Sequence, residues 1–139
     1  MTFLLDTNVV SEAMKPRPNA GVMAWLTAVE EDGVFLSVVT ITELRYGIER
    51  LQKGKRRDRL DRWLRKDLIQ RFEGRILPVD PEIADACGRL IAKSESSDRP
   101  IEARDAFIAA TAEVHRLTLV TRNASDFEAI LKSILTPWT

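Results

Sequence analysis

The sequence has few of the residues on which most metal and nucleophile sites depend. Its 139 residues include one cysteine, Cys87, and one histidine, His115. A single cysteine excludes an intrachain disulfide and any zinc site built from several cysteines, and it fits a reducing cytoplasm. A single histidine excludes His-pair metal sites, and a Ser-His-Asp triad would have to use His115. Hydrolytic chemistry in this chain is therefore expected to depend on carboxylates.

Long hydrophobic runs are also missing. No apolar stretch approaches the roughly 20 residues of a membrane-spanning helix. No basic region precedes an apolar stretch at the start, so we expect neither a membrane anchor nor a signal peptide. Hydrophobic residues make up 45% of the chain and charged residues 30%, as in ordinary globular proteins. We expect a single cytoplasmic domain over residues 1–139, which is long enough to bury a core of its own.

The formal net charge is zero, but the charges are unevenly distributed. Residues 50–75, called the basic segment below, contain eleven Lys or Arg and four Asp or Glu. The stretches before and after it are acidic. The first contains three Lys or Arg and seven Asp or Glu, and the second contains seven Lys or Arg and ten Asp or Glu. Such a segment indicates a polyanionic or acidic partner, and a solvated helix face is the structural alternative. The cations expected to contact a partner are Lys55, Arg56, Arg57, Arg59 and Arg62.

Short apolar runs alternate with helical patterns along the chain. Runs that are apolar on both faces are typical of strands buried in a parallel sheet. Alternation of strands and helices predicts right-handed crossovers that place helices on both faces of the sheet. The sequence therefore predicts a three-layer α/β/α sandwich with a mostly parallel central sheet of four to five strands. The predicted strands cover residues 2–5, 34–38, 76–79, 118–121 and, at the edge, 134–135.

Acidic or amide side chains follow three of the predicted strands. Asp6 follows the first strand, Glu43 lies shortly after the second, and Asn123 follows the fourth. The carboxyl ends of parallel strands lie at one edge of the sheet, where open α/β folds bind their ligands. Asp105 joins this edge only if the alanine-rich helix that it begins starts on the same side, which the helix-then-strand order permits. These four residues are the candidate catalytic residues.

Each of the carboxylates also has a structural explanation. Asp6 is a favoured N-cap for the helix expected over residues 7–15. Thr40 and Glu43 have the spacing of a capping box, in which the glutamate bonds back to the backbone at the start of a helix. Asp105, in the first turn of its helix, interacts favourably with the helix dipole. Taken one at a time, these residues leave both explanations open.

Carboxylates that share one sheet edge repel one another unless they are protonated or neutralised by a cation. Because the available ligands are all oxygens, the expected cation is a hard one, Mg²⁺ or Mn²⁺. Mg²⁺ usually takes one or two carboxylates together with phosphate oxygens of a substrate. The reaction that this combination indicates is metal-assisted hydrolysis of a phosphodiester.

Four stretches carry a family resemblance: Leu5–Asn8, Thr42–Gly47, Asp105–Ala112 and Leu119–Asn123. In this order they resemble the motifs of PIN domains, in particular the FitB-like branch of the VapC toxin ribonucleases from VapBC-type toxin–antitoxin modules. The resemblance covers nearly the whole chain. It implies a bacterial Mg²⁺- or Mn²⁺-dependent endoribonuclease that cuts RNA. It also implies homodimers, and a VapB- or FitA-like antitoxin whose C-terminal segment lies across the active site.

The resemblance carries three acidic metal ligands onto this chain, namely Asp6, Glu43 and Asp105. The fourth position departs from the family pattern, because relatives often have Asp where this chain has Asn123. An amide still offers one oxygen ligand. Asp126, three residues further on, is the alternative source of the missing charge. The sequence leaves the fourth ligand and the number of metal ions open.

Two other classes of protein compete with the nuclease. An aspartyl-phosphate enzyme would use Asp6 as its nucleophile. Enzymes of the haloacid dehalogenase type usually have a second Asp where this chain has Asn8, and a receiver domain needs an acidic pair and a lysine that are absent here. A non-catalytic RNA- or protein-binding module on the same fold is the other alternative, since a fold does not fix a function.

Overall fold

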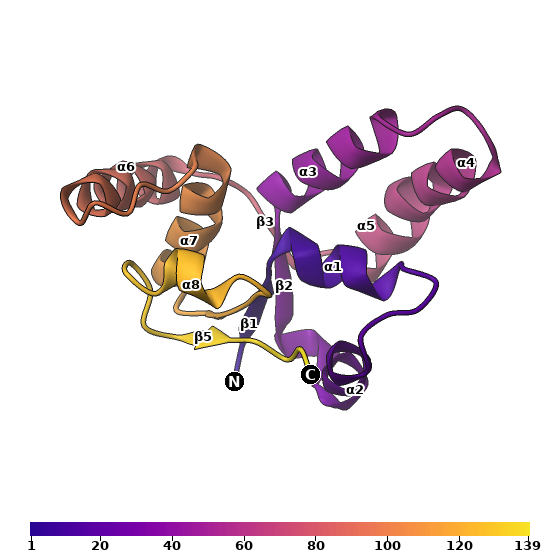
Figure 1. Cartoon of the computed structure of the whole chain (residues 1–139), viewed down its shortest axis with the longest axis horizontal. Helices are drawn as coiled ribbons and strands as arrows, with labels where there is room; N and C mark the ends of the chain where they lie inside the picture. The colour runs from indigo at the N-terminus through magenta and orange to yellow at the C-terminus, as the bar shows by residue number, and fades with distance from the viewer.

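The computed structural model describes residues 1–139 and contains a five-stranded, wholly parallel sheet between two layers of helices (Figure 1). The strand order is β3-β2-β1-β4-β5, so the first strand lies at the centre and the last at one edge. This arrangement confirms the predicted α/β/α sandwich. The strands are β1 (Phe3–Leu5), β2 (Val34–Ser37), β3 (Ile76–Leu77), β4 (Thr118–Val120) and β5 (Ile134–Leu135).

Helices cover both faces of the sheet and divide the core into two clusters. One cluster lies under α6 (Pro81–Ser96) and α7 (Ala103–His115), with short α8 (Ala124–Phe127) beside them (Figure 1). The other face is covered by α1 (Thr7–Ala13), α2 (Ala20–Ala28), α3 (Val38–Glu49) and the helical stretch over residues 55–71. A short 3₁₀ turn, η1 (Glu31–Gly33), precedes β2. No helix is both long enough and apolar enough to cross a membrane.

Small side chains let α7 pack closely on the sheet. Ala106, Ala109, Ala110 and Ala112 are all fully or almost fully buried in the first cluster. Alanine has the best helix propensity and adds little bulk, so the helix axis can approach the strands. The neighbouring Cys87 is buried in the same cluster and is a small core residue.

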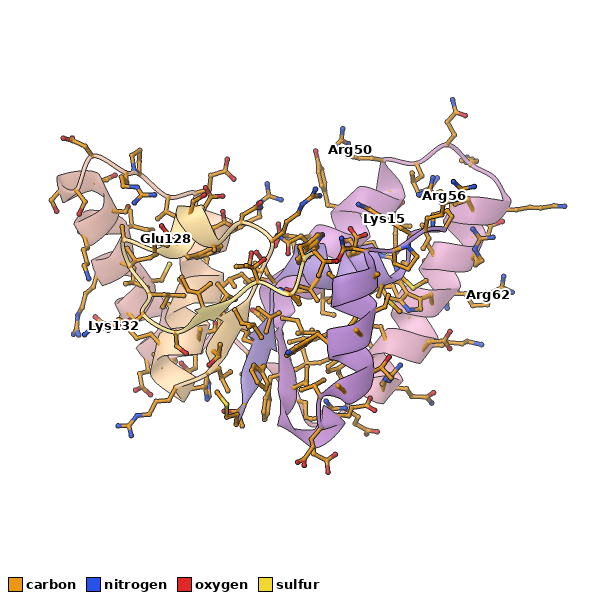
Figure 2. All side chains as sticks on the ribbon, turned by 60° about the horizontal axis from the view of Figure 1, so that its bottom comes forward. Lys15, Arg50, Arg56, Arg62, Glu128 and Lys132 are labelled. Carbon is orange, nitrogen blue, oxygen red and sulfur yellow. The ribbon has the colours of Figure 1, made fainter.

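The second helical layer carries most of the cations of the basic segment. Its long helical stretch consists of α4 (Lys55–Arg62), a π-helical stretch, η2 (Trp63–Leu68), and α5 (Ile69–Arg71). Figure 2 shows Arg50 at the end of α3 and both Arg56 and Arg62 along α4. The apolar side of this stretch faces α1 and α2 across an apolar groove of about 710 Å³. The basic segment therefore presents its charges outward.

The strand order brings two distant segments to one crevice. β1 pairs with β4 in the register Leu5↔Val120, so Asp6 and Thr121 leave the sheet side by side. The chain order reverses between these two strands, because β2 and β3 lie on one side of β1 while β4 and β5 lie on the other. In open α/β sheets, the point of such a reversal leaves a crevice at the carboxyl ends of the strands.

The capping box expected at Thr40 and Glu43 is not formed. α3 begins at Val38, and its cap is Ser37, whose Oγ accepts a hydrogen bond of 3.0 Å from the Val39 N–H. Thr40 is therefore inside the helix, where Glu43 cannot cap it. The capping explanation of Glu43 is wrong.

Replacing Ser37 with alanine should test this cap. Ser37→Ala removes the Oγ acceptor for the Val39 N–H and is expected to lower the free energy of unfolding by about 1 kcal/mol. Thr42→Ala, at an exposed position of the same helix, is the control and should change stability by less than about 0.5 kcal/mol. Urea unfolding followed by circular dichroism measures both. If both substitutions lowered the free energy of unfolding by the same amount, Ser37 would not be the cap of α3.

Candidate active site

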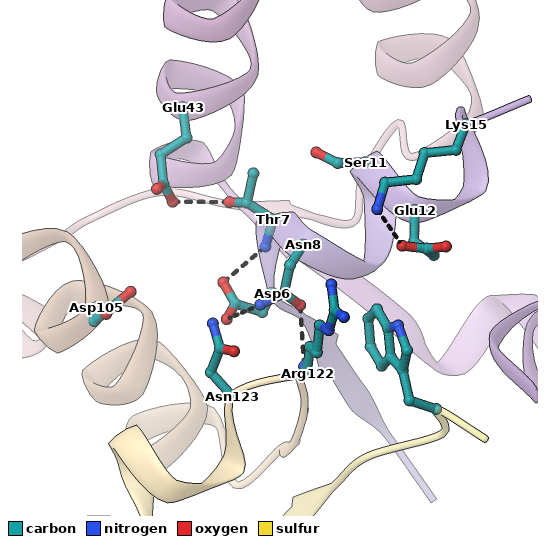
Figure 3. A pocket seen from close by; sticks show the side chains of 11 residues that line it. Asp6, Thr7, Asn8, Ser11, Glu12, Lys15, Glu43, Asp105, Arg122 and Asn123 are labelled. Atoms are coloured by element: carbon teal, nitrogen blue, oxygen red, sulfur yellow. Dashed lines mark hydrogen bonds and ion pairs between the residues drawn. The ribbon is translucent and has the colours of Figure 1, made fainter. Parts of the chain in front are cut away.

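A polar pocket of about 350 Å³ opens at the carboxyl edge of the sheet and brings the four candidate residues together (Figure 3). Asp6 comes from the end of β1, Glu43 from α3, Asp105 from the first turn of α7, and Asn123 from the loop after β4. The helix that carries Asp105 therefore starts on the expected side. The other residues that line the pocket are Thr7, Asn8, Ser11, Glu12, Lys15, Arg122 and Trp138.

Asp6 is the most firmly held of the four. Its side chain is only 5% exposed, and Oδ1 accepts a hydrogen bond of 2.7 Å from the Thr7 N–H at the start of α1. Oδ2 accepts bonds from the Thr121 hydroxyl at 2.8 Å and from the Asn8 amide at 3.2 Å. Burial nevertheless raises the pKa of Asp6 above its ordinary value, and nearby Glu43 raises it further. Asp6 therefore caps the helix and also places an incompletely compensated carboxylate in the pocket.

Glu43 is held by side chains rather than by the backbone of its own helix. Its Oε1 accepts a hydrogen bond of 2.8 Å from the Thr7 hydroxyl, which also lies 3.2 Å from the Thr40 hydroxyl. The guanidinium of Arg104 lies 3.8 Å from Oε2. Thr7 thus ties α1 to α3 and orients Glu43 towards the pocket shared with Asp6 (Figure 3).

Asp105 has the most strongly perturbed acidity in the chain. Burial raises its pKa to about 6, and the negative charges of Asp6, Glu43, Glu102 and Asp126 add to this in decreasing order. The helix dipole acts in the opposite sense, since Asp105 lies in the first turn of α7. Because the pKa is raised, burial and like charges outweigh the dipole. The dipole explanation alone does not account for this residue.

The pocket contains Asn123 and not Asp126. Asn123 is exposed, its N–H donates to the Thr121 hydroxyl at 3.1 Å, and its side chain lines the pocket. Asp126 lines an adjacent hollow that shares Asp105 with the pocket. The negative charge of Asp126 therefore acts on the site through Asp105, whereas Asn123 presents its amide directly.

The residues of the pocket fit a hard divalent cation. The donors are carboxylate and amide oxygens, and the raised pKa of Asp105 indicates negative charge that the protein does not neutralise. No three of the acidic, histidine or cysteine side chains lie close enough to form a metal cluster by themselves. Mg²⁺ retains several waters and usually binds only one or two carboxylates directly. The carboxylates available to hold such an ion are Asp6, Glu43 and Asp105, and Asn123 lines the same pocket.

Comparison with known proteins agrees with this architecture. The family model described as "PIN domain" matches residues 3–131. The chain belongs to the PIN-domain family. It is 39% identical over 136 residues to Toxin FitB of Neisseria gonorrhoeae and 37% identical over 136 residues to the VapC ribonuclease Y4jK of Sinorhizobium fredii. These matches cover 98% of this chain, with 98% of the first relative and 97% of the second.

The crystal structure of FitAcB from Neisseria gonorrhoeae has the same fold. Its TM-score with this chain is 0.93 at 39% sequence identity, and the match covers 99% of each chain. The predicted family and fold are both confirmed. The PIN domain described here therefore shares its whole architecture, rather than a single motif, with the toxin structure.

Sequence reasoning missed several residues in or beside this PIN-domain pocket. The hydroxyl of fully buried Thr121 donates to Asp6 across 115 positions of the sequence, while the side-chain Oδ1 of Asn8 accepts from the Arg122 N–H at 3.1 Å. Buried Glu12 binds Lys15 at 2.8 Å, and that pairing lowers the pKa of Glu12. An isolated Thr or Glu carries no sequence signal. The only available clue to Thr121 was its place beside Asp6 once β1 and β4 are paired.

Asp105→Asn should stabilise the cation-free protein in a pH-dependent way. The pKa of Asp105 is about 6 in the folded state and near 3.8 in the unfolded chain. The folded state therefore binds this proton more tightly, and stability falls as the pH rises from about 4 to about 6. The variant should melt above the wild type at pH 7.5 in EDTA. Its advantage should disappear near pH 4, and loss of the favourable dipole interaction keeps the gain modest.

The matched control for that measurement is Asp126→Asn. Asp126 is exposed and contributes the weakest of the four negative charges that raise the pKa of Asp105, so its removal should give a smaller gain. Thermal melts of the wild type and both variants at pH 4 and pH 7.5 measure these gains in melting temperature. A gain for Asp105→Asn that is the same at pH 4 and pH 7.5 would contradict the raised pKa.

Proposed function

We propose that this PIN domain is a divalent-cation-dependent endoribonuclease that acts as the toxin of a type II toxin–antitoxin pair. The observation that carries the proposal is the convergence of Asp6, Glu43 and Asp105 in one open pocket, where the pKa of Asp105 is raised to about 6. Strongly perturbed carboxylates in a cleft are typical of functional sites. Relatives over nearly the whole chain bear the names toxin and ribonuclease.

Each residue of the pocket has its own role in the proposed hydrolysis. A bound Mg²⁺ or Mn²⁺ would supply Lewis acidity and lower the pKa of water at the site. Asp6 is fixed on both oxygens by three donors, so it suits the task of holding the cation in one place. Glu43 is oriented by Thr7, and Asp105 carries the uncompensated charge that the cation would neutralise. Asn123 adds a neutral amide at the edge of the site.

The proposed partners are an RNA substrate, a cognate VapB- or FitA-like antitoxin and a second copy of this chain. The basic segment supports an anionic partner, because seven of its cations form no ion pair. The seven are Arg50, Lys53, Lys55, Arg56, Arg59, Arg62 and Lys66. The other four, Arg57, Arg65, Arg71 and Arg75, form ion pairs. Arg57, which was expected to contact a partner, pairs with Glu49 instead.

Asp6→Asn is the variant that tests the proposed activity. Asn keeps the capping function at the start of α1 but removes the carboxylate, so RNA cleavage should fall by at least 100-fold while the melting temperature changes little. Cleavage of total cellular RNA should require Mg²⁺ or Mn²⁺ and stop in EDTA. Cleavage sites can be mapped on the same RNA to identify the substrate.

Asp85→Asn, on the exposed side of α6, is the control and should leave cleavage unchanged. An Asp6→Asn protein that unfolds would assign Asp6 a structural role. A folded variant with full activity would remove Asp6 from the site. If the wild type binds RNA and never cuts it with either cation, the chain is a non-catalytic binding module on the PIN fold.

The free cations of the basic segment should give binding its salt dependence. Phosphate contacts release counterions, with a slope of about −0.7 per contact for single strands. Replacing Lys55, Arg56, Arg59 and Arg62 together with Gln should therefore reduce the slope of log Kd against log salt by up to about 3, for RNA or for the antitoxin. Fluorescence anisotropy at several salt concentrations measures this slope.

The matched control replaces four cations that lie outside the basic segment: Arg89, Lys93, Arg116 and Lys132. Lys132 lies at the opposite end of the molecule from Arg56 in Figure 2. These substitutions change the net charge by the same amount and should leave most of the slope in place. If both variants keep the wild-type slope for both partners, the basic segment is a solvated helix face.

A further inference from the structure

The pocket has a second half that the proposed hydrolysis does not use. Figure 3 shows Glu12 and Lys15 on the side away from Asp105. Arg122 and Trp138 line the same pocket, and Trp138 is its only hydrophobic side chain. A large aromatic ring in an otherwise polar pocket next to carboxylates calls for an explanation.

One free cation accompanies this ring. Glu12 is buried, and both of its carboxylate oxygens already have partners. Its Oε1 binds Lys15 at 2.8 Å, and its Oε2 accepts from the Asn19 N–H at 2.8 Å. Arg122, in contrast, has an exposed side chain with no hydrogen bond or ion pair, and its guanidinium lies 5.8 Å from the centre of the Trp138 ring. This half of the pocket therefore offers an aromatic surface and an available guanidinium.

The residues on either side of Trp138 hold it in place. The Asn19 side chain donates to the main-chain oxygen of Thr139 at 3.0 Å and accepts from its N–H at 3.2 Å. The main-chain oxygen of Pro137 lies so close to Gly21 that a Cβ there would overlap it. Trp138 also packs against the second core cluster. The ring is therefore a fixed part of the pocket.

We propose that Trp138 and Arg122 form a binding subsite for one unpaired nucleobase of RNA, adjacent to the phosphate placed at the carboxylates. This inference rests on the proposed ribonuclease function. Unpaired bases stack on aromatic rings and on Arg guanidinium planes, whereas bases in a duplex have no free face. The subsite selects single-stranded RNA and fixes its register relative to the site of cleavage.

The spacing requires only a small movement. A base between the two groups needs about 6.8 Å, which is two stacking distances of roughly 3.4 Å. The guanidinium of Arg122 lies 5.8 Å from the centre of the Trp138 ring. An outward movement of the exposed Arg122 side chain by about 1 Å would therefore make room for the base. The base then stacks on Trp138, and the guanidinium covers its other face or contacts the neighbouring phosphate.

The test uses Asp6→Asn protein with Mg²⁺, so that RNA binds without being cut. The probe is an eight-nucleotide oligouridylate that contains one 2-aminopurine, whose fluorescence falls when it stacks on tryptophan. Trp138→Leu should abolish the quenching and raise Kd about tenfold, which lies within the range for base–aromatic stacking. Trp138→Phe should keep most of the affinity, and the same probe in a duplex should bind at least tenfold more weakly.

A second aromatic–arginine pair supplies the matched control. Tyr46 is 54% exposed, Arg50 lies 5.3 Å from the centre of its ring, and neither residue lines the pocket. Tyr46→Leu should leave both quenching and Kd unchanged. Because Trp138→Leu also removes packing, Arg122→Gln is the second variant. It changes an exposed side chain and should weaken binding several-fold without lowering the melting temperature.

The possible results separate the subsite from the function. If the wild type cuts RNA but Trp138→Leu and Arg122→Gln both bind and quench normally, the subsite is overturned and the nuclease stands. If these variants bind RNA normally but no longer retain the co-expressed antitoxin, Trp138 belongs to a protein interface, which also overturns the subsite. If the wild type neither cuts nor binds RNA, the proposed function fails.

Discussion

Repulsion among carboxylates that are partly withdrawn from water is the constraint on which the rest of this site depends. Burial and neighbouring negative charges raise the pKa values of Asp6 and Asp105. Hydrogen bonds from Thr7, Asn8 and Thr121 to Asp6 offset only part of the rise in the pKa of Asp6. Such an arrangement lowers stability, and it persists because the packed sheet and helices hold the end of β1 beside the start of α7. A cation that binds only the folded state would recover that stability by mass action.

The sequence was informative where the relevant signal is local. Apolar runs located all five strands, and Asp6 and Asn123 were assigned to the carboxyl edge because each directly follows a strand. The strand order, in which β1 pairs with both β2 and β4, was not predicted and comes from the structure. The predicted features depend on side-chain periodicity, which a single chain displays directly.

Features that depend on contacts between distant segments were not predictable in this way. Thr40 and Glu43 have capping-box spacing, yet α3 begins earlier because Ser37 supplies the cap. Glu43 instead accepts its hydrogen bond from Thr7, which lies 36 positions away in the sequence. Trp138 has no sequence signal of its own, and only the contacts of its neighbours with Asn19 and Gly21 place it at the pocket. Local sequence patterns do not encode such contacts.

The distribution of charge explains how a chain of zero net charge could bind the proposed RNA substrate. Net charge governs long-range attraction, and here it contributes little. The attraction would come from the free cations of the basic segment and from Arg122, and salt would screen it because these side chains are exposed. The carboxylates of the pocket would repel the same polyanion at its phosphates. A hard cation at the proposed carboxylate site would reverse that local repulsion, so substrate entry and cation binding would depend on each other.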